Sequence, residues 1–273
     1  MGAKLIGIVA PASRLDQSMV GAVRTLARTM DPALELLFHP QCLLSSGHFA
    51  GDDEARTRAF LDVANDPNFD ALWVARGGYG SARIAESVIA QLSDVARQKV
   101  YLGYSDAGAL LGGLYRAGCR VAHGPMPADI LRAGGETAVA RALGWLCDGN
   151  LAALEPSLDP AVPAVAYNMI VFSQILGTPL EPDLTGHVLM LEEVSEHLYA
   201  MDRTMFHITS TPSVRRIAGI RLGRVSDILP NEPAFGETEE EIVRHWCEVS
   251  GIAYLGRADI GHDVDNKVVP FGL

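Results

Sequence analysis

The residues best placed to do chemistry lie in one short stretch, residues 100–112, where an apolar run meets a hydroxyl and a carboxyl side chain. The apolar run ends at Gly103, Ser105 and Asp106 follow, and residues 107–115 suit a helix. This order predicts a strand, a sharp turn and a helix, which together expose a serine beside the N–H groups of a helix N-terminus. An exposed nucleophile and donors for an oxyanion are two requirements of acyl transfer.

A simpler role for Ser105 is open at this point. A serine just before a helix commonly caps it, and Asp106 would interact favourably with the helix dipole. The stretch also departs from the usual nucleophile elbow, G-x-S-x-G, because its second glycine stands one place late, at Gly108. Other parts of the chain must therefore decide whether this serine is a nucleophile.

A serine nucleophile needs a base to accept its proton and an acid to orient that base. Of the eight histidines, His123 ends a predicted strand before a Gly-Pro turn, and His262 lies in a loop near the C-terminus. Glu192 and Glu193 end another apolar strand. Because adjacent strand residues point to opposite faces, only one of them can face a site, and we expect Glu193 to form a surface salt bridge. The residues alone leave the base and the acid open.

A glycine-rich turn follows a further predicted strand, at residues 76–83. Glycines between a strand and a helix let the backbone approach a ligand closely, so a phosphate loop is one interpretation and a tight turn without a ligand is another. The sequence has neither G-x-G-x-x-G nor G-x-x-x-x-G-K-[ST], and it lacks H-E-x-x-H and any His/Cys cluster with zinc spacing. We therefore expect no metal ion and no cofactor.

The composition excludes several partner classes. The 273-residue chain carries a formal net charge of −11, which argues against nucleic acid and anionic membranes, since both require a basic face. No apolar run approaches the ~20 residues that span a bilayer, and residues 5–12 predict a strand, not a signal peptide. The four cysteines are scattered without a C-x-x-C pair, which is typical of reduced thiols in the cytoplasm.

Strand and helix patterns alternate through the first half of the chain, which predicts a parallel sheet with right-handed crossovers. The expected strands are residues 4–10, 34–38, 71–75, 100–103 and 120–123, and the expected helices include one that Ser13 caps and one that begins at Asp52 and Asp53. Ligand sites in such sheets lie at the carboxyl ends of strands. Gly77, Gly78, Ser105 and His123 are expected there.

The periodicity is lost over residues 149–165, where three prolines interrupt the chain, and we place a linker there. The predicted fold class is α/β, with an N-terminal Rossmann-like parallel-sheet domain over residues 1–148 and a smaller C-terminal α/β domain over residues 166–273. In the second half we expect strands at residues 187–191, 217–222 and 252–255, and helices at residues 199–208 and 237–249.

Taken together, these residues resemble the LD-carboxypeptidases, the serine peptidase family that includes muramoyltetrapeptide carboxypeptidase and the microcin C self-immunity peptidase. The resemblance covers most of the chain. The matching blocks are residues 7–13, 49–56, 75–83, 103–106, 123–126, 177–179, 191–196, 199–203, 261–266 and 270–272. Any one block is weak evidence for the family, whereas this many blocks in the family's order are specific to it.

The resemblance implies a catalytic triad of Ser105, His262 and Glu192, because the family's carboxylate is the first acid after the apolar strand. It also implies an oxyanion hole formed by the backbone N–H groups of Asp106 and Gly78. The family fold divides the triad between two domains, with the nucleophile in the first and the acid and base in the second. A homodimer is implied as well.

The implied reaction is cleavage of the L,D-peptide bond that releases the terminal D-alanine from a peptidoglycan tetrapeptide, through an acyl-enzyme. The alternative is a microcin-immunity-like serine peptidase that acts on a peptide or acyl-adenylate conjugate. The candidates for contact with a small peptide or muropeptide are Arg76, Gly77, His123 and Arg203, and an arginine would hold its free carboxylate. A nucleotide-binding protein and a non-catalytic protein that binds cell-wall peptides are the other classes considered.

Overall fold

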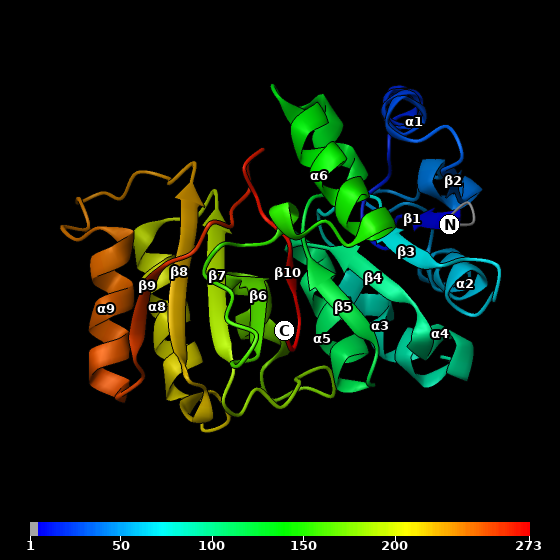
Figure 1. Cartoon of the computed structure of the whole chain (residues 1–273). Helices are drawn as coiled ribbons and strands as arrows, with labels where there is room; N and C mark the ends of the chain where they lie inside the picture. Colours follow the sequence, from blue (N-terminus) through cyan, green and yellow to red (C-terminus); the bar gives the residue numbers. More distant parts are fainter. Residues whose placement is uncertain (1–4) are drawn as a thin grey trace.

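The computed structural model describes residues 5–273, and its strands form two sheets (Figure 1). The strands are β1 (Leu5–Val9), β2 (Glu35–Phe38), β3 (Ala71–Val74), β4 (Val100–Gly103), β5 (Arg120–His123), β6 (Ala164–Asn168), β7 (Val188–Val194), β8 (Gly219–Ser226), β9 (Tyr254–Arg257) and β10 (Val269–Pro270). The helices are α1 (Gln17–Met30), α2 (Asp53–Ala64), α3 (Ser81–Ala90), α4 (Asp94–Gln98), α5 (Gly108–Arg116), α6 (Gly135–Asp148), α7 (Met169–Ile175), α8 (Leu198–Ser210) and α9 (Glu239–Ser250).

The two sheets confirm the predicted α/β fold class. The first sheet has six strands in the order β10-β5-β4-β3-β1-β2, and the second has four in the order β6-β7-β8-β9. Within residues 5–273, every pairing between these strands is parallel except that of β10 with β5. Parallel strands covered on both faces are apolar throughout, and all four residues of β3 are buried. The carboxyl ends of β4 and β7 therefore become the places where polar side chains can gather.

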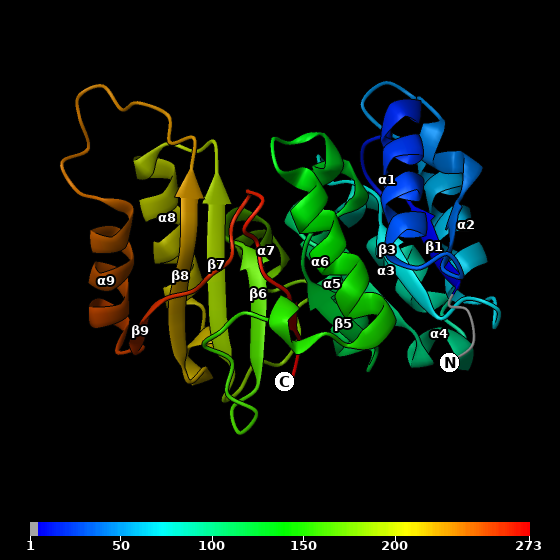
Figure 2. The same cartoon turned by 45° about the horizontal axis from the view of Figure 1, so that its top comes forward.

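Helices cover both faces of the first sheet. Helices α1 and α6 pack on one face and α2, α3 and α5 on the other, while α7, α8 and α9 cover one face of the second sheet (Figures 1 and 2). One buried apolar cluster runs from α5 across to the second sheet and includes Leu110, Tyr167, Phe172 and Met205. A continuous core thus joins the N-terminal and C-terminal halves of the chain. The division of the chain into two domains at residues 149–165 stays a prediction.

The C-terminal segment ties the two sheets together. Strand β10 pairs antiparallel with β5, and Pro270 sits on this edge strand, where proline is tolerated. Beyond it, the N–H of Gly272 donates to the carbonyl of Ala164 (2.9 Å), and the N–H of Ala164 donates to the carbonyl of Leu273 (3.0 Å). The chain that carries His262 is therefore anchored to the first sheet on one side and to β6 on the other.

Several element boundaries differ from the expected ones. Helix α1 begins after Asp16, whose side chain accepts from the N–H of Ser18, and not after Ser13. Ser13 is held in a turn, because its N–H donates to the carbonyl of Gly77 (3.4 Å). Strand β6 begins inside the expected linker, and the first residue of the expected opening strand, Lys4, lies outside the described residues. No helix within residues 5–273 has the length and apolar character needed to cross a membrane.

The close packing of α5 against α7 gives a stability prediction. A Cβ added at Gly112 would lie 2.8 Å from Ile175 Cδ1 and 3.0 Å from the Leu180 carbonyl oxygen, and the backbone oxygen cannot move aside cheaply. We expect Gly112→Ala to lower the free energy of unfolding by about 1–3 kcal/mol.

A matched control is available in α1, where a Cβ at Gly21 meets nothing within 4 Å. We expect Gly21→Ala to raise the free energy of unfolding by about 0.5–1 kcal/mol, because alanine is the better helix former. Urea denaturation of both variants measures this contrast, and equal effects of the two substitutions would contradict the packing.

Candidate active site

Ser105 stands at a sharp turn between β4 and α5. Its φ is +60°, a left-handed backbone conformation that non-glycine residues seldom adopt outside special turns. A 3-10 turn over Ser105–Ala107 then leads into α5. The strand, turn and helix expected here are therefore present, and they expose the hydroxyl at the carboxyl end of the sheet.

The glycine turn after β3 packs against this serine. A Cβ at Gly77 would lie 2.9 Å from Ser105 Oγ, so only glycine fits beside the hydroxyl. Gly78 has a φ of +107°, and a Cβ there would lie 2.3 Å from Ser13 Oγ. Both glycines are needed for close approach, and they bring the backbone of the turn next to Ser105.

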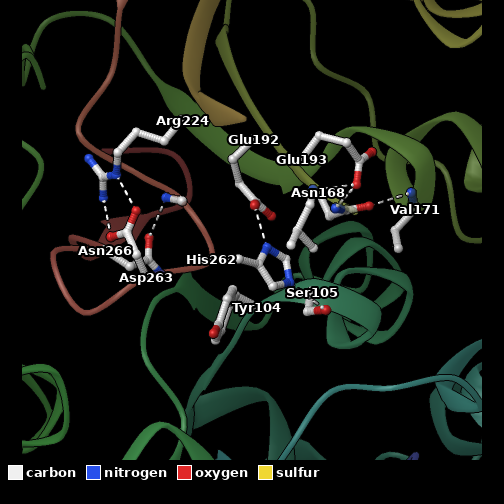
Figure 3. Close-up of polar contacts among 12 residues, drawn as sticks. Tyr104, Ser105, Asn168, Val171, Glu192, Glu193, Arg224, His262, Asp263 and Asn266 are labelled. Carbon is white, nitrogen blue, oxygen red and sulfur yellow. Dashed lines mark hydrogen bonds and ion pairs between the residues drawn. The ribbon is translucent and has the colours of Figure 1, made fainter. Parts of the chain in front are cut away.

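The structure brings Ser105, His262 and Glu192 into one hydrogen-bonded series (Figure 3). His262 Nε2 lies 3.0 Å from Ser105 Oγ, and His262 Nδ1 lies 2.5 Å from Glu192 Oε2. An ionised carboxylate only accepts hydrogen bonds, so Nδ1 carries the proton and Nε2 is left to accept from the serine. The serine comes from the first sheet, the glutamate from β7 and the histidine from the loop after β9.

The pKa of His262 depends on its partners. Burial by itself lowers this pKa, but the charge of Glu192 and its hydrogen bond raise it, and the net result is a pKa above the ordinary value of 6.5. The Tyr104 ring packs against the imidazole with 4.9 Å between ring centres. The imidazole is thus held between a fully buried carboxylate and an aromatic face.

Glu193 is not the surface carboxylate that we expected. Only 3% of its surface is exposed, and it accepts hydrogen bonds from Asn168 Nδ2 (2.7 Å) and from the N–H of Ile170 (3.0 Å). Burial raises the pKa of Glu193 to about 7. The surface prediction was wrong because β6 and the N-terminus of α7 cover this side of β7, and Glu193 links them to the strand.

The loop that carries His262 is fixed from several sides. Asn266 Oδ1 accepts from the N–H of Gly261 and from His123 Nε2, both at 3.1 Å. Arg141 donates to the carbonyls of Val264 (2.8 Å) and Asn266 (2.9 Å). These contacts reach the loop from β5 and α6, so the first half of the chain positions the histidine of the second half.

Asp106 joins the two parts of the expected oxyanion hole. Its carboxylate accepts from the N–H groups of Ser81 (2.8 Å) and Gly80 (3.3 Å), which fixes the glycine turn beside Ser105. Burial raises the pKa of this carboxyl, against the effect of those hydrogen bonds. Its own backbone N–H lies at the start of a helical turn, where such groups lack an intrahelical partner.

A cavity of about 230 Å³ opens beside Ser105 and His262. Of the four candidates for substrate contact, Arg76 and Gly77 line it together with Gly78, the expected oxyanion donor, whereas His123 and Arg203 lie elsewhere. His123 is 1% exposed and bonded to Asn266, and burial lowers its pKa to about 4. Arg203 lies on α8 with its guanidinium 5.5 Å from the centre of the Tyr199 ring.

Sequence reasoning missed three polar residues that line the same cavity, namely Tyr104, Asp129 and Arg132. Tyr104 Oη donates to Asp129 Oδ1 (2.8 Å), and Arg132 Nε donates to the same oxygen (3.0 Å). Asp129 and Arg132 could have been found from their position in the sequence, because residues 124–132 follow the carboxyl end of a predicted strand, where ligand sites lie. Within residues 5–273, no group of three or more His, Cys, Asp or Glu side chains is arranged to hold a metal ion.

The fold and the site together define a class of protein. A serine at a strained strand-to-helix turn, hydrogen-bonded to a histidine that a buried carboxylate orients, is the arrangement that acyl-transferring hydrolases use. The profile of the LD-carboxypeptidase N-terminal domain matches residues 6–124, and that of the C-terminal domain matches residues 163–273. The chain belongs to the LD-carboxypeptidase family, which confirms the resemblance, and it is a peptidase by that membership.

Curated relatives agree with this family. The chain is 31% identical over 230 residues to a Synechocystis sp. protein named as a carboxypeptidase, covering 83% of this chain and 75% of the relative. It is 22% identical over 285 residues to the murein tetrapeptide carboxypeptidase of Pseudomonas aeruginosa, covering 98% and 91%.

Solved structures share the fold. The muramoyltetrapeptide carboxypeptidase from Oxalobacter formigenes superposes with a TM-score of 0.81 at 20% identity, over 97% of this chain and 93% of that one. The microcin C7 self immunity protein MccF in complex with aspartyl sulfamoyl adenosine superposes with a TM-score of 0.78 at 15% identity, over 100% and 97%.

The hydrogen bond between Glu192 and His262 gives a prediction that needs no substrate. NMR titration of the imidazole should place the pKa of His262 above 6.5, and Glu192→Gln should lower it because the opposing effect of burial then remains. Glu193→Gln is the matched control, since Glu193 is a lesser cause of the rise. A His262 pKa that is the same in the parent and in E192Q would contradict the geometry.

Proposed function

We propose that this protein is a serine carboxypeptidase that cleaves the L,D-peptide bond and releases the terminal D-alanine from peptidoglycan tetrapeptides. The observation that carries the proposal is the Ser105–His262–Glu192 series, with distances of 3.0 and 2.5 Å, in a chain of the LD-carboxypeptidase family. The relatives named as murein and muramoyltetrapeptide carboxypeptidases support this substrate. A cytoplasmic homodimer is part of the proposal, with the homodimer resting on the family resemblance and the cytoplasmic location on the scattered cysteines.

The proposed mechanism begins with attack by Ser105 Oγ on the carbonyl carbon of the L-centre, while His262 Nε2 takes the hydroxyl proton. The backbone N–H groups of Asp106 and Gly78 hold the oxyanion of the tetrahedral intermediate. The C–N bond then breaks, and the proton on Nε2 passes to the leaving D-alanine amine. Glu192 stabilises the imidazolium and keeps the Nδ1 proton in place.

Water completes the reaction. It attacks the acyl carbon of the ester on Ser105 while His262 again takes a proton, and collapse of the second tetrahedral intermediate returns that proton to Ser105 Oγ. The shortened peptide leaves with a new carboxylate. Besides water, the bond-making and bond-breaking steps use only the three side chains and the two backbone donors.

A buried carboxylate argues against a phosphate loop at the glycine turn. The Asp106 carboxylate already accepts from the N–H groups at the start of α3, which are the groups that a phosphate would need. A nucleotide held by the glycine turn would face this buried carboxylate.

The fold shared with MccF supports a second candidate, a peptidase for acyl-adenylate or related peptide conjugates. We expect the parent protein to release D-alanine from the L,D-tetrapeptide and to leave an all-L tetrapeptide intact. Faster cleavage of an acyl-adenylate conjugate than of the tetrapeptide would favour the second candidate.

The nucleophile is tested on whichever substrate is cleaved. We expect Ser105→Ala to lower kcat by about 10⁶-fold, because the covalent route is lost, while Ser87→Ala, at an exposed position on α3, retains parental activity. Chromatographic assay of the product released from that substrate measures both. Activity of S105A close to that of S87A would overturn the assignment of Ser105.

A further inference from the structure

We infer that Arg132 binds the terminal carboxylate of the substrate and thereby makes the site a carboxypeptidase. The inference rests on the proposed function, because it takes Ser105 as the nucleophile. Arg132 follows the 3-10 turn Pro127–Leu131 after β5, and its side chain lines the cavity that also contains Ser105 and His262. No feature of the sequence had marked this arginine as a site residue.

The geometry of a C-terminal residue requires an anchor close to the nucleophile. Three covalent bonds separate the attacked carbonyl carbon from the carboxylate carbon of the leaving residue, so the two lie no more than about 4 Å apart. The anchor must therefore reach into the cavity beside Ser105. Among the arginines considered, Arg132 and Arg76 line this cavity, and Arg203 lies on α8 against Tyr199.

The guanidinium of Arg132 is held ready for a ligand. Nε donates to Asp129 Oδ1 (3.0 Å), and Nη1 donates to the carbonyl oxygen of His262 (2.5 Å). These bonds use two of the five N–H donors of a guanidinium, and the side chain is still 44% exposed. A guanidinium that is already fixed by two hydrogen bonds loses little conformational entropy on binding a carboxylate, and this improves affinity.

The charges around the cavity favour an anion. Asp129 is the acidic residue on its wall, but its oxygens already accept from Tyr104 Oη (2.8 Å), the N–H of Met126 (2.8 Å) and Arg132. Arg76 adds a second guanidinium, whose Nη1 donates only weakly, to the carbonyl of Arg14 at 3.3 Å. A positive cavity in a chain with a net charge of −11 suits a substrate carboxylate.

Arg132 is favoured over Arg76 by its link to the reacting groups. Its bond to the His262 carbonyl places the guanidinium beside the residue that must protonate the leaving amine, and that amine is attached to the carbon that bears the carboxylate. Arg76 is bonded instead to the backbone before α1. Arg132 can thus hold the carboxylate while His262 delivers a proton to the same leaving residue.

The test compares two substrates that differ only at the C-terminus, the L,D-tetrapeptide with a free carboxylate and the same peptide as its C-terminal amide. We expect the parent to prefer the free acid by about 10²-fold in kcat/KM, as a lost charge-assisted pair would cost. In Arg132→Gln we expect kcat/KM for the free acid to fall by about 10²-fold. The kcat/KM for the amide should change by no more than a few fold. Arg132→Lys should keep part of the preference, Arg76→Gln should weaken it less than Arg132→Gln does, and the matched control Arg203→Gln, on α8 outside the cavity, should leave it unchanged.

Each other outcome overturns the inference in a defined way. Equal losses on the acid and the amide in R132Q would mean that Arg132 only positions His262. Collapse of the preference in R76Q would assign the anchor to Arg76, and no preference in the parent would remove the need for an anchor.

Binding measurements separate this inference from the proposed function. Calorimetry on S105A should show tighter binding of the acid than of the amide, and S105A/R132Q should bind the two alike. If the parent cleaves neither peptide, the proposed function fails while this comparison still decides the role of Arg132. Unchanged discrimination in S105A/R132Q would contradict the inference.

Discussion

The hydrogen bond between Ser105 Oγ and His262 Nε2 is the contact on which the rest of the structure depends, because it joins side chains 157 positions apart in the chain. One of them stands at the carboxyl end of β4, and the other lies in a loop of the C-terminal half. A hydrogen bond of this kind is lost if either element moves by an ångström. The architecture must therefore hold two sheets in a fixed relation.

Three sets of contacts maintain that relation. The apolar cluster runs from α5 to the helices of the second sheet without a break. Strand β10 pairs with β5, and the residues that follow it pair with the start of β6. Polar contacts from Arg132, His123 and Arg141 then fix the loop around His262 itself. Because most of these donors come from the first half of the chain, the nucleophile-bearing half also orients the base.

Local patterns were enough to predict the parts of the fold and site that depend on neighbouring residues. The apolar run before Ser105 and the helical residues after it specify a strand and a helix, so the exposed turn could be predicted. The roles of the two glutamates were harder to predict, because strand alternation indicates only that Glu192 and Glu193 face opposite sides of the sheet. The choice of Glu192 came from the family resemblance, and Glu193 was wrongly expected at the surface because the covering by α7 is a tertiary effect.

Contacts between distant segments could not be predicted from local patterns, and the triad was expected from the family resemblance alone. His123 ends β5 and His262 lies in the loop between β9 and β10, and only the return of the chain as β10 decides which imidazole reaches the serine. Strand β10 has two residues, too few to give a periodic signal. Arg132 lies in an irregular segment whose path depends on Asp129 and Tyr104, so its place beside the serine follows from tertiary contacts alone.

The most direct measurement is reaction of the folded protein with a serine-directed fluorophosphonate, followed by mass spectrometry of the modified peptide. A hydroxyl activated by an imidazole from the other half of the chain should give a single adduct, on Ser105, and the rate should fall by several orders of magnitude in His262→Ala or after unfolding. An adduct elsewhere, or equal rates in the parent and H262A, would contradict the account.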